Sequence, residues 1–285
     1  MIVLSLAAKY NLAVHQMDVK TAFLNGKLDE DIYMSQPDGY IKEENVHLVC
    51  KLDRSLYGLK QLPRMWNKTI DEFMIKLGFK KCESDHCIYI QRNGQHMIFV
   101  TLYVDGLVLA GSSEKMLNET KCALSKRFEM TDMGQLKYFL GMEIDRDDSA
   151  KKISIRQTKF AKDILEKLGM INSSPVKSPQ DPGIKLTKDM CEGGCNHVDT
   201  MANVPCQNVV GCLLYLMVGT RPNLAAAVGV LSQFAADPCP RHWQALKRIF
   251  RYIQGTKTHG TELQASTRTG LATSSLGEMQ VATHS

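Results

Sequence analysis

Residues 97–111 restrict most strongly what this chain can fold into. Two apolar runs, residues 97–104 and 107–110, flank the pair Asp105-Gly106. An Asp-Gly pair between apolar runs predicts an antiparallel hairpin, because two-residue hairpin turns need positive φ at their central positions. A tight turn is the simple interpretation of Asp105. The alternative is a carboxylate at a rigid hairpin tip, which could bind a divalent metal if a second carboxylate approached from a neighbouring strand.

Asp18 is a candidate for that second carboxylate. It lies in an otherwise apolar run, residues 14–19, that predicts a strand. A buried carboxylate without a partner is costly, so Asp18 needs a cation, a cap or water. The competing interpretation is a residue at the end of a strand that caps the next short helix.

The rest of the chain alternates between strand-like and helix-like patterns, which predicts an α+β fold. We expect strands at residues 14–19, 31–35, 47–52, 87–91, 97–104, 107–110 and 139–144. Spacings of three and four between apolar residues predict helices at 64–77, 114–128, 160–168, 209–218, 224–234 and 242–254. The apolar residues 1–8 suggest a helix entered midway, and the proline-rich residues 173–182 suggest a linker.

Composition narrows the class of protein further. With 285 residues, 44% hydrophobic and 23% charged, the chain is too ordinary to be wholly disordered, collagen-like or a coiled coil. No apolar stretch reaches 18 residues and no convincing secretory signal is present, so we expect neither a membrane span nor secretion. The nine cysteines are scattered, several of them in apolar segments, which suggests reduced thiols and an intracellular location, cytoplasmic or nuclear.

Several segments together resemble one known family. They are residues 15–26 (His-Gln-Met-Asp-Val-Lys-Thr-Ala-Phe-Leu-Asn-Gly), 50–61 with Arg64 and Trp66, 103–106 (Tyr-Val-Asp-Gly), 139–144 (Phe-Leu-Gly-Met-Glu-Ile), 219–223 (Gly-Thr-Arg-Pro-Asn) and 242–256. In this order and over residues 1–260, they resemble the reverse transcriptases of copia-type retrotransposons, the RNA-directed DNA polymerase part of a Pol polyprotein. Against that family the chain looks truncated at both ends.

The resemblance implies a reverse-transcriptase palm, an antiparallel sheet with helices on one face, followed by a helical thumb and connection. In that scheme residues 1–150 hold part of the fingers and the palm, and residues 151–185 hold a thumb-like helix and the proline-rich linker. Residues 186–260 then form a helical connection region. Residues 261–285 are small, polar and aperiodic, which predicts a disordered tail.

The resemblance also implies a two-metal site for Mg²⁺ or Mn²⁺, in which Asp18 and Asp105 match two of three metal-binding aspartates. The expected substrates are deoxynucleoside triphosphates, and the expected partners are an RNA template, a DNA primer and possibly other parts of the polyprotein. The family has Tyr-Val-Asp-Asp at the hairpin tip, whereas this chain has Gly106 in the last position. Because a hard cation is held by charged oxygen ligands, we expect weak metal binding and little or no polymerisation. Asp-Gly should still form the hairpin turn.

Further matches imply contacts with nucleotide and nucleic acid. For nucleotide binding they are Lys20, Phe23 and Gln61; for the template-primer they are Lys60, Arg64 and Gly141. The plainer alternatives are a core aromatic for Phe23, a polar loop group for Gln61 and a surface charge for Arg64. Residues 51–81 carry eight basic and three acidic side chains, an excess that would attract a phosphate backbone. A non-catalytic nucleic-acid-binding remnant is therefore the competing hypothesis.

Two other clusters carry basic or metal-ligating side chains. Basic residues recur in and beside the predicted helix at 242–254, at Arg241, Lys247, Arg248, Arg251 and Lys257. The resemblance places them in the connection region, where they could follow the nucleic-acid duplex, but the apolar residues among them indicate a packing element first. Cys191, Cys195, His197 and Cys206 have spacings that permit zinc, yet they lack the second tight pair typical of zinc sites.

Overall fold

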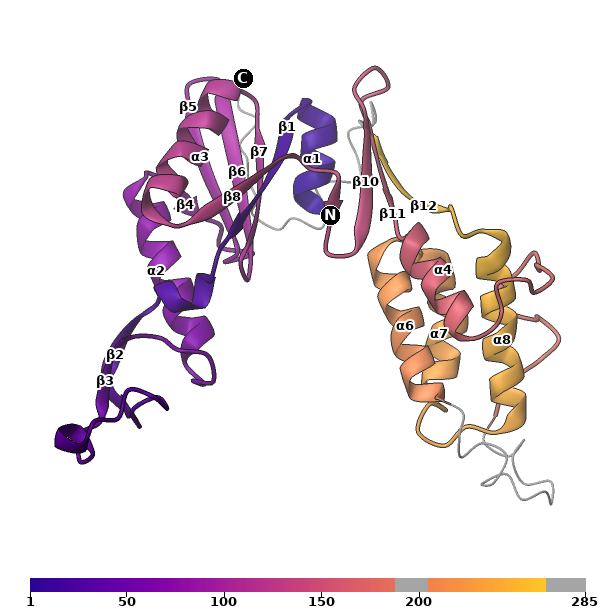
Figure 1. The fold of residues 1–285 in the computed structure, drawn as a ribbon. Coiled ribbons are helices and arrows are strands. Elements are labelled where there is room, and N and C mark those ends of the chain that lie inside the picture. Colours follow the sequence, from indigo (N-terminus) through magenta and orange to yellow (C-terminus); the bar gives the residue numbers. More distant parts are fainter. Residues whose placement is uncertain (188–204, 265–285) are drawn as a thin grey trace. The chain divides into compact units, whose positions relative to one another are not determined.

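The computed structural model describes residues 1–187 and 205–264, and the chain divides into two compact units, Met1–Leu136 and Lys137–Leu263 (Figure 1). The elements of the first unit are α1 (Ile2–Tyr10), β1 (Ala13–Val19), the 3-10 helix η1 (Ala22–Asn25), β2 (Lys27–Met34), the 3-10 helix η2 (Glu43–Asn45), β3 (Cys50–Arg54), α2 (Leu62–Lys76), β4 (Lys80–Lys81), β5 (Ile88–Asn93), β6 (His96–Tyr103), β7 (Gly106–Gly111), α3 (Glu114–Arg127) and β8 (Met130–Gln135).

The first unit is built on a six-stranded antiparallel sheet with the order β4-β5-β6-β7-β1-β8. Side chains alternate between the two faces of a strand, so Met17 and Val19 in β1 and Leu107 and Leu109 in β7 share one face. There they pack with apolar residues of α2 and α3, among them Trp66. The amphipathic spacing that predicted these two helices is therefore what covers the sheet.

Helices are not confined to one face of this sheet. Phe99, Val108 and Ala110 alternate with the core residues and are also buried, at 1%, 5% and 0% exposure. Helix α1 contacts β7 and lies on this opposite side (Figure 1). The expected antiparallel sheet is present, and the expectation of helices on one face is too simple.

Strands β2 and β3 form a separate two-stranded antiparallel sheet. The pairing of Met34 with Cys50 and of Tyr33 with Lys51 sets its register. β3 begins three residues later than the predicted strand at 47–52, because residues 46–49 are exposed turn and loop.

The elements of the second unit are β9 (Tyr138–Phe139), β10 (Met142–Asp147), β11 (Lys152–Arg156), α4 (Thr158–Lys167), α6 (Cys206–Gly219), the 3-10 helix η4 (Pro222–Leu224), α7 (Ala225–Ser232), α8 (Pro240–Gly255) and β12 (Gly260–Gln264). The strands form an antiparallel sheet in the order β12-β11-β10-β9. The helices pack on one another, α4 on α8 and α7 on both α6 and α8, around a core that includes Leu213, Val228 and Phe250.

Two predictions for this unit are wrong. Residues 139–144 are not one strand, because Leu140 (φ 49°) and Gly141 (φ 74°) form a turn that pairs Met142 with Phe139. The predicted disordered tail begins too early, because β12 includes residues 261–264 and Lys152 forms an ion pair with Glu262 at 2.6 Å. Residues 265–285 lie outside the described part of the chain.

Candidate active site

Asp18 lies near the end of β1, opposite Gly106 of β7 in the antiparallel register. Its neighbours Met17 and Val19 point into the core, so the alternation of side chains places the Asp18 carboxylate on the other face of the sheet. The residue is half-buried. Burial, and after it the negative charge of Asp105, raise the pKa of the Asp18 carboxyl above its ordinary value of 3.8. The negative charge of Asp105 therefore acts on the Asp18 carboxyl.

Asp105 occupies the turn between β6 and β7, but the turn is not the one that the sequence predicts. Tyr103 pairs with Gly106, so the two central residues are Val104 and Asp105. Val104 has a φ of 57°, whereas neither Asp105 nor Gly106 is among the described residues with positive φ. A β-branched residue in this region is strained, and such strain tends to occur at functional sites. Gly106 is the first residue of β7 and has no turn conformation to satisfy.

Trp66 anchors this turn through a hydrogen bond to its backbone. Its side chain is 2% exposed within α2, and its indole N–H donates to the Val104 carbonyl oxygen at 2.6 Å. Phe128 packs edge-on against the indole ring, with ring centroids 5.3 Å apart. On the other side of the turn, the backbone N–H of Val19 donates to the Asp105 carbonyl oxygen at 2.9 Å. The strained turn is thus fixed by a buried helix and by β1.

Lys20 and Phe23 follow Asp18 directly. Lys20 is exposed and forms an ion pair with Glu129 at 2.8 Å, so its charge already has a partner. Phe23 lies in η1, half-buried against the core, and its ring meets Tyr57 edge-on with centroids 6.2 Å apart. Glu129 and Tyr57 were not singled out from the sequence, because neither stands at a spacing that suggests contact with residues 20–23.

Gln61, Lys60 and Arg64 surround the start of α2. Gln61 is the N-cap residue, and its carbonyl oxygen accepts from the Met65 N–H at 3.0 Å. Lys60 and Arg64 are exposed, and no ion pair within the described residues involves either of them.

The basic excess of residues 51–81 is partly neutralised within the first unit. Two acidic residues from outside the segment reduce it, because Lys51 pairs with Asp31 at 2.6 Å and Lys68 with Asp29 at 3.0 Å. Lys81 pairs with Asp71 at 2.8 Å, an acidic residue already counted within 51–81. The charge available to a phosphate backbone is therefore smaller than the sequence suggests. Lys60 and Arg64 at the start of α2 are exposed basic residues without an ion pair among the described residues, so they remain available to a phosphate backbone.

Gly141 belongs to the second unit, not to the unit that holds the two aspartates. It is the second residue of the β9–β10 turn, and the Tyr215 hydroxyl lies where a side chain at position 141 would begin. That hydroxyl donates to the Leu140 carbonyl oxygen at 2.5 Å. Gly141 therefore has a structural reason to be glycine.

Asp18 and Asp105 are the groups that could hold a divalent cation. Carboxylate oxygens are the ligands that Mg²⁺ prefers, and a cation between the two would offset the repulsion that, after burial, raises the pKa of Asp18. Within residues 1–187 and 205–264, no group of three or more His, Cys, Asp or Glu side chains could hold a metal ion. The residues present thus fit a cation with two protein carboxylates rather than three. Of the possible zinc cluster, Cys191, Cys195 and His197 lie outside the described residues, and Cys206 is buried in α6.

The fold is a mixed α/β structure with antiparallel sheets, as expected for a reverse transcriptase domain. The family model described as "Reverse transcriptase (RNA-dependent DNA polymerase)" matches residues 1–182. The chain belongs to this family, and its relatives place it with the Pol polyproteins of copia-type retrotransposons.

Three relatives illustrate the match. The chain is 44% identical over 255 residues to the retrovirus-related Pol polyprotein from transposon TNT 1-94 of Nicotiana tabacum, covering 89% of this chain and 19% of that protein. It is 38% identical over 263 residues to the polyprotein from transposon RE1 of Arabidopsis thaliana, covering 92% and 17%. The putative transposon Ty5-1 protein of Saccharomyces cerevisiae is 34% identical over 242 residues, covering 85% and 76%. The chain thus spans less than a fifth of the two Pol polyproteins. Within residues 1–187 and 205–264, no helix has the length and apolar character that crossing a bilayer requires.

Proposed function

We propose that the first unit is an RNA-directed DNA polymerase site that uses Asp18 and Asp105, with its activity impaired by Gly106. The observation that carries the proposal is the register of the sheet: Asp18 lies near the end of β1 opposite Gly106, and Asp105 is the turn residue directly before Gly106. Repulsion between like charges is tolerated at sites that bind a cation.

The reaction would join the primer 3′-hydroxyl oxygen to the α-phosphorus of a deoxynucleoside triphosphate, with pyrophosphate leaving and the hydroxyl proton passing to solvent. A bound Mg²⁺ or Mn²⁺ would supply charge stabilisation at the attacking and leaving oxygens. Asp18 and Asp105 would hold the cation and so position the two reacting groups. Phe23, Gln61 and Lys20 would face the incoming nucleotide, and the exposed charges of Lys60 and Arg64 would contact template-primer phosphates.

Gly106 is the reason to expect impairment. It stands opposite Asp18 in the register, on the side of the sheet where the Asp18 carboxylate lies. A carboxylate at this position would be a third anionic ligand for the cation. A water molecule in its place carries no charge, so the affinity for Mg²⁺ falls.

Primer extension on an RNA template tests the proposal, first with Mg²⁺ and then with Mn²⁺. We expect little extension by the natural chain, clear extension by Gly106→Asp, and none by Gly106→Asp combined with Asp18→Asn. If the natural chain and Gly106→Asp extend equally, the proposed impairment is wrong. If neither extends although both bind the template-primer, the site lacks more than one ligand and the polymerase proposal fails for this chain.

A non-catalytic nucleic-acid-binding role is the second candidate, and Gly106 is the observation that favours it. Fluorescence anisotropy with an RNA–DNA hybrid would then show salt-dependent binding without extension. Replacing Lys60 or Arg64 by Gln should lower the slope of log affinity against log salt by about one each. Lys115→Gln on α3 is the control, because Lys115 lies outside the basic segment and is exposed. Absence of binding at low salt would contradict both candidates.

The division into partial fingers and palm, thumb-like helix, linker and connection, with boundaries at 150 and 185, stays a proposal, as does the template-primer role of Gly141. So do the intracellular location, cytoplasmic in a virus-like particle or nuclear, and an association with other parts of a Pol polyprotein.

A further inference from the structure

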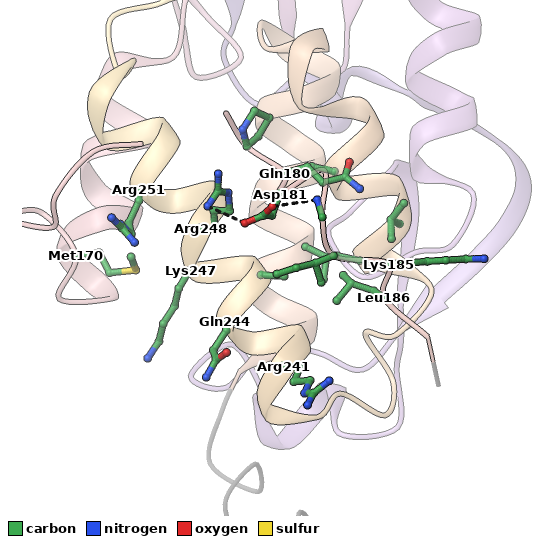
Figure 2. A pocket seen from close by; sticks show the side chains of 17 residues that line it. Met170, Gln180, Asp181, Lys185, Leu186, Arg241, Gln244, Lys247, Arg248 and Arg251 are labelled. Carbon is green, nitrogen blue, oxygen red and sulfur yellow. Dashed lines mark hydrogen bonds and ion pairs between the residues drawn. The ribbon is translucent and has the colours of Figure 1, made fainter. Parts of the chain in front are cut away.

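The second unit contains an open cavity of about 670 Å³ between α7, α8 and the segment that precedes residue 188 (Figure 2). This volume lies in the range of ligand sites, roughly 300–1,000 Å³. The lining residues that fall within 1–187 and 205–264 all belong to the second unit, so a ligand bound there would be independent of the polymerase proposal for the first unit. We call this cavity the α8 groove.

The floor of the α8 groove is aliphatic. Ala227 and Leu231 of α7 and Ala245 of α8 contribute to it, and Leu186 closes one side. Ile184, also in the lining, is 51% exposed, which leaves apolar surface open to solvent. No aromatic side chain is among the lining residues that the structure describes. The floor therefore suits aliphatic side chains and offers no ring on which a nucleic-acid base could stack.

The rim of the α8 groove is strongly basic. Among the described residues of the lining, the cations are Lys185, Arg241, Lys247, Arg248 and Arg251, and the acidic side chain is Asp181. Arg241, Arg248 and Arg251 are seven and three residues apart, so they follow one face of α8 over about 15 Å. Figure 2 shows these side chains along α8, with Arg248 turned toward Asp181.

Only part of this charge is satisfied within the unit. Arg248 reaches Asp181 at 3.5 Å and Ser178 Oγ at 3.1 Å, and Arg251 donates to the Ser174 carbonyl oxygen at 2.7 Å. The Nε of Arg248 is nevertheless buried without a hydrogen-bond partner. Lys185 and Arg241 have no ion-pair partner within residues 1–187 and 205–264.

We propose that the α8 groove binds an acidic segment of another polypeptide, with carboxylates interspersed among aliphatic side chains. The cations extend over nearly three helical turns, too far for one small anion, whereas successive Glu or Asp residues of a peptide match that spacing. The aliphatic floor would take the peptide's Leu or Val side chains. Charge complementarity and an apolar floor without aromatics favour a peptide over a nucleic-acid strand.

The test is fluorescence anisotropy on the full chain with a labelled helical peptide of about 16 residues, carrying Glu and Leu on one face. The reference probes are a scrambled peptide of the same composition, a version with Gln for each Glu, and a labelled single-stranded RNA. We expect the designed peptide to bind at least about tenfold more tightly than the scrambled one. Lys185→Gln with Arg241→Gln should weaken it about five- to tenfold.

The control removes equal charge elsewhere on the same unit. Lys162→Gln with Lys167→Gln on α4 lies outside the groove lining and should leave peptide affinity unchanged. Ala245→Trp should abolish binding by filling the floor without changing the net charge; should it fail to fold, the two double variants decide. Equal binding of designed and scrambled peptides, or equal weakening by both double variants, would overturn the proposal. So would an RNA that binds more tightly and displaces the peptide, since that result assigns the groove to nucleic acid.

Discussion

Replacing Trp66 by Phe should loosen the turn that presents Asp105. The indole N–H donates to the Val104 carbonyl at 2.6 Å, and a hydrogen bond of this kind contributes about 1 kcal/mol net. The ring is 2% exposed, and a phenyl ring leaves about 40 Å² less apolar surface buried, a loss of about 1 kcal/mol. The edge-on contact with Phe128 is kept by a phenyl ring. The local opening free energy of the hairpin should therefore fall by about 2 kcal/mol.

Amide hydrogen exchange measures this change where it occurs. In peptides that cover β6 and β7, exchange should quicken about 30-fold if amides exchange through opening of the hairpin. Trp243→Phe is the matched control, because the chain has two Trp residues and Trp243 is a half-buried side chain of α8 in the second unit. It should leave exchange in β6 and β7 unchanged, while Trp66→Phe should leave the fluorescence of Trp243 unchanged.

The anchoring role of Trp66 is refuted if Trp66→Phe leaves exchange in β6 and β7 within about twofold of the natural chain, a difference that corresponds to under about 0.5 kcal/mol. Faster exchange across the whole first unit, with no excess in the hairpin, would also count against it. In that case Trp66 would act as a general core residue and not as the anchor of the turn.

Three further predictions concern charge and backbone. Asp105→Asn should lower the pKa of Asp18 in an NMR titration and, by removing repulsion, stabilise the metal-free chain at neutral pH by about 0.2–0.5 kcal/mol. Because the pKa of Asp18 is raised in the folded chain, ionisation of Asp18 opposes folding above that raised pKa, and the cost is lost as the pH falls from there to below 3.8. If the pKa of Asp18 is the same in Asp105→Asn as in the natural chain, the proposed repulsion between the two carboxylates is wrong. Lys121 Nζ lies 2.7 Å from His15 Nδ1 and 2.9 Å from Asp132, so Lys121→Met should raise the pKa of His15, which burial and then Lys121 hold below 6.5. In the natural chain, the contribution of neutral His15 to the free energy of unfolding is fully present above pH 6.5 and declines as the pH falls toward the lowered pKa. Urea titrations should show a shallower decline in Lys121→Met than in the exposed control Lys115→Met. Gly141→Ala should cost at least about 2 kcal/mol by urea denaturation and Gly169→Ala about 1, because both have positive φ but only Gly141 meets Tyr215; equal losses would exclude a role for that contact.

The helices and central strands could be predicted because their signals are local. In α2, Trp66, Ile70 and Met74 recur at a spacing of four and are all 2% exposed or less, so the pattern in the sequence is the pattern of burial. The central strand β7 is apolar and buried along its whole length, and β6 is apolar and buried at residues 98–100 and 102. Where one face or both faces of an element meet the core, composition alone indicates the structure.

The edge strands could not be predicted in this way. β8, with the sequence Met-Thr-Asp-Met-Gly-Gln, is largely exposed, and it is a strand because it pairs with β1, more than a hundred residues earlier in the chain. β12 is equally polar and pairs with β11. Ion pairs near the site could not be predicted for the same reason. Glu129 pairs with Lys20, and Asp132 pairs with Lys121, only once the edge of the sheet has formed. Their contacts follow from tertiary structure, which one sequence does not display.

The register of the β6–β7 hairpin shows that the turn does not require glycine at position 106. Had Asp105 and Gly106 formed the turn, Gly106 would have been required by the backbone and a carboxylate there would have strained it. The turn instead consists of Val104 and Asp105, with the strain at Val104, where a positive φ costs a non-glycine residue about 1–2 kcal/mol. Position 106 is an ordinary strand position, and a side chain there would have its Cβ roughly 5 Å from that of Asp18. Because Gly106 is buried, Gly106→Asp should keep the hairpin register but lower metal-free stability by about 1–3 kcal/mol, through desolvation of the added carboxylate as well as repulsion from Asp18. Mg²⁺ should restore that stability in Gly106→Asp more than in the natural chain, because a third carboxylate strengthens cation binding to the folded state alone.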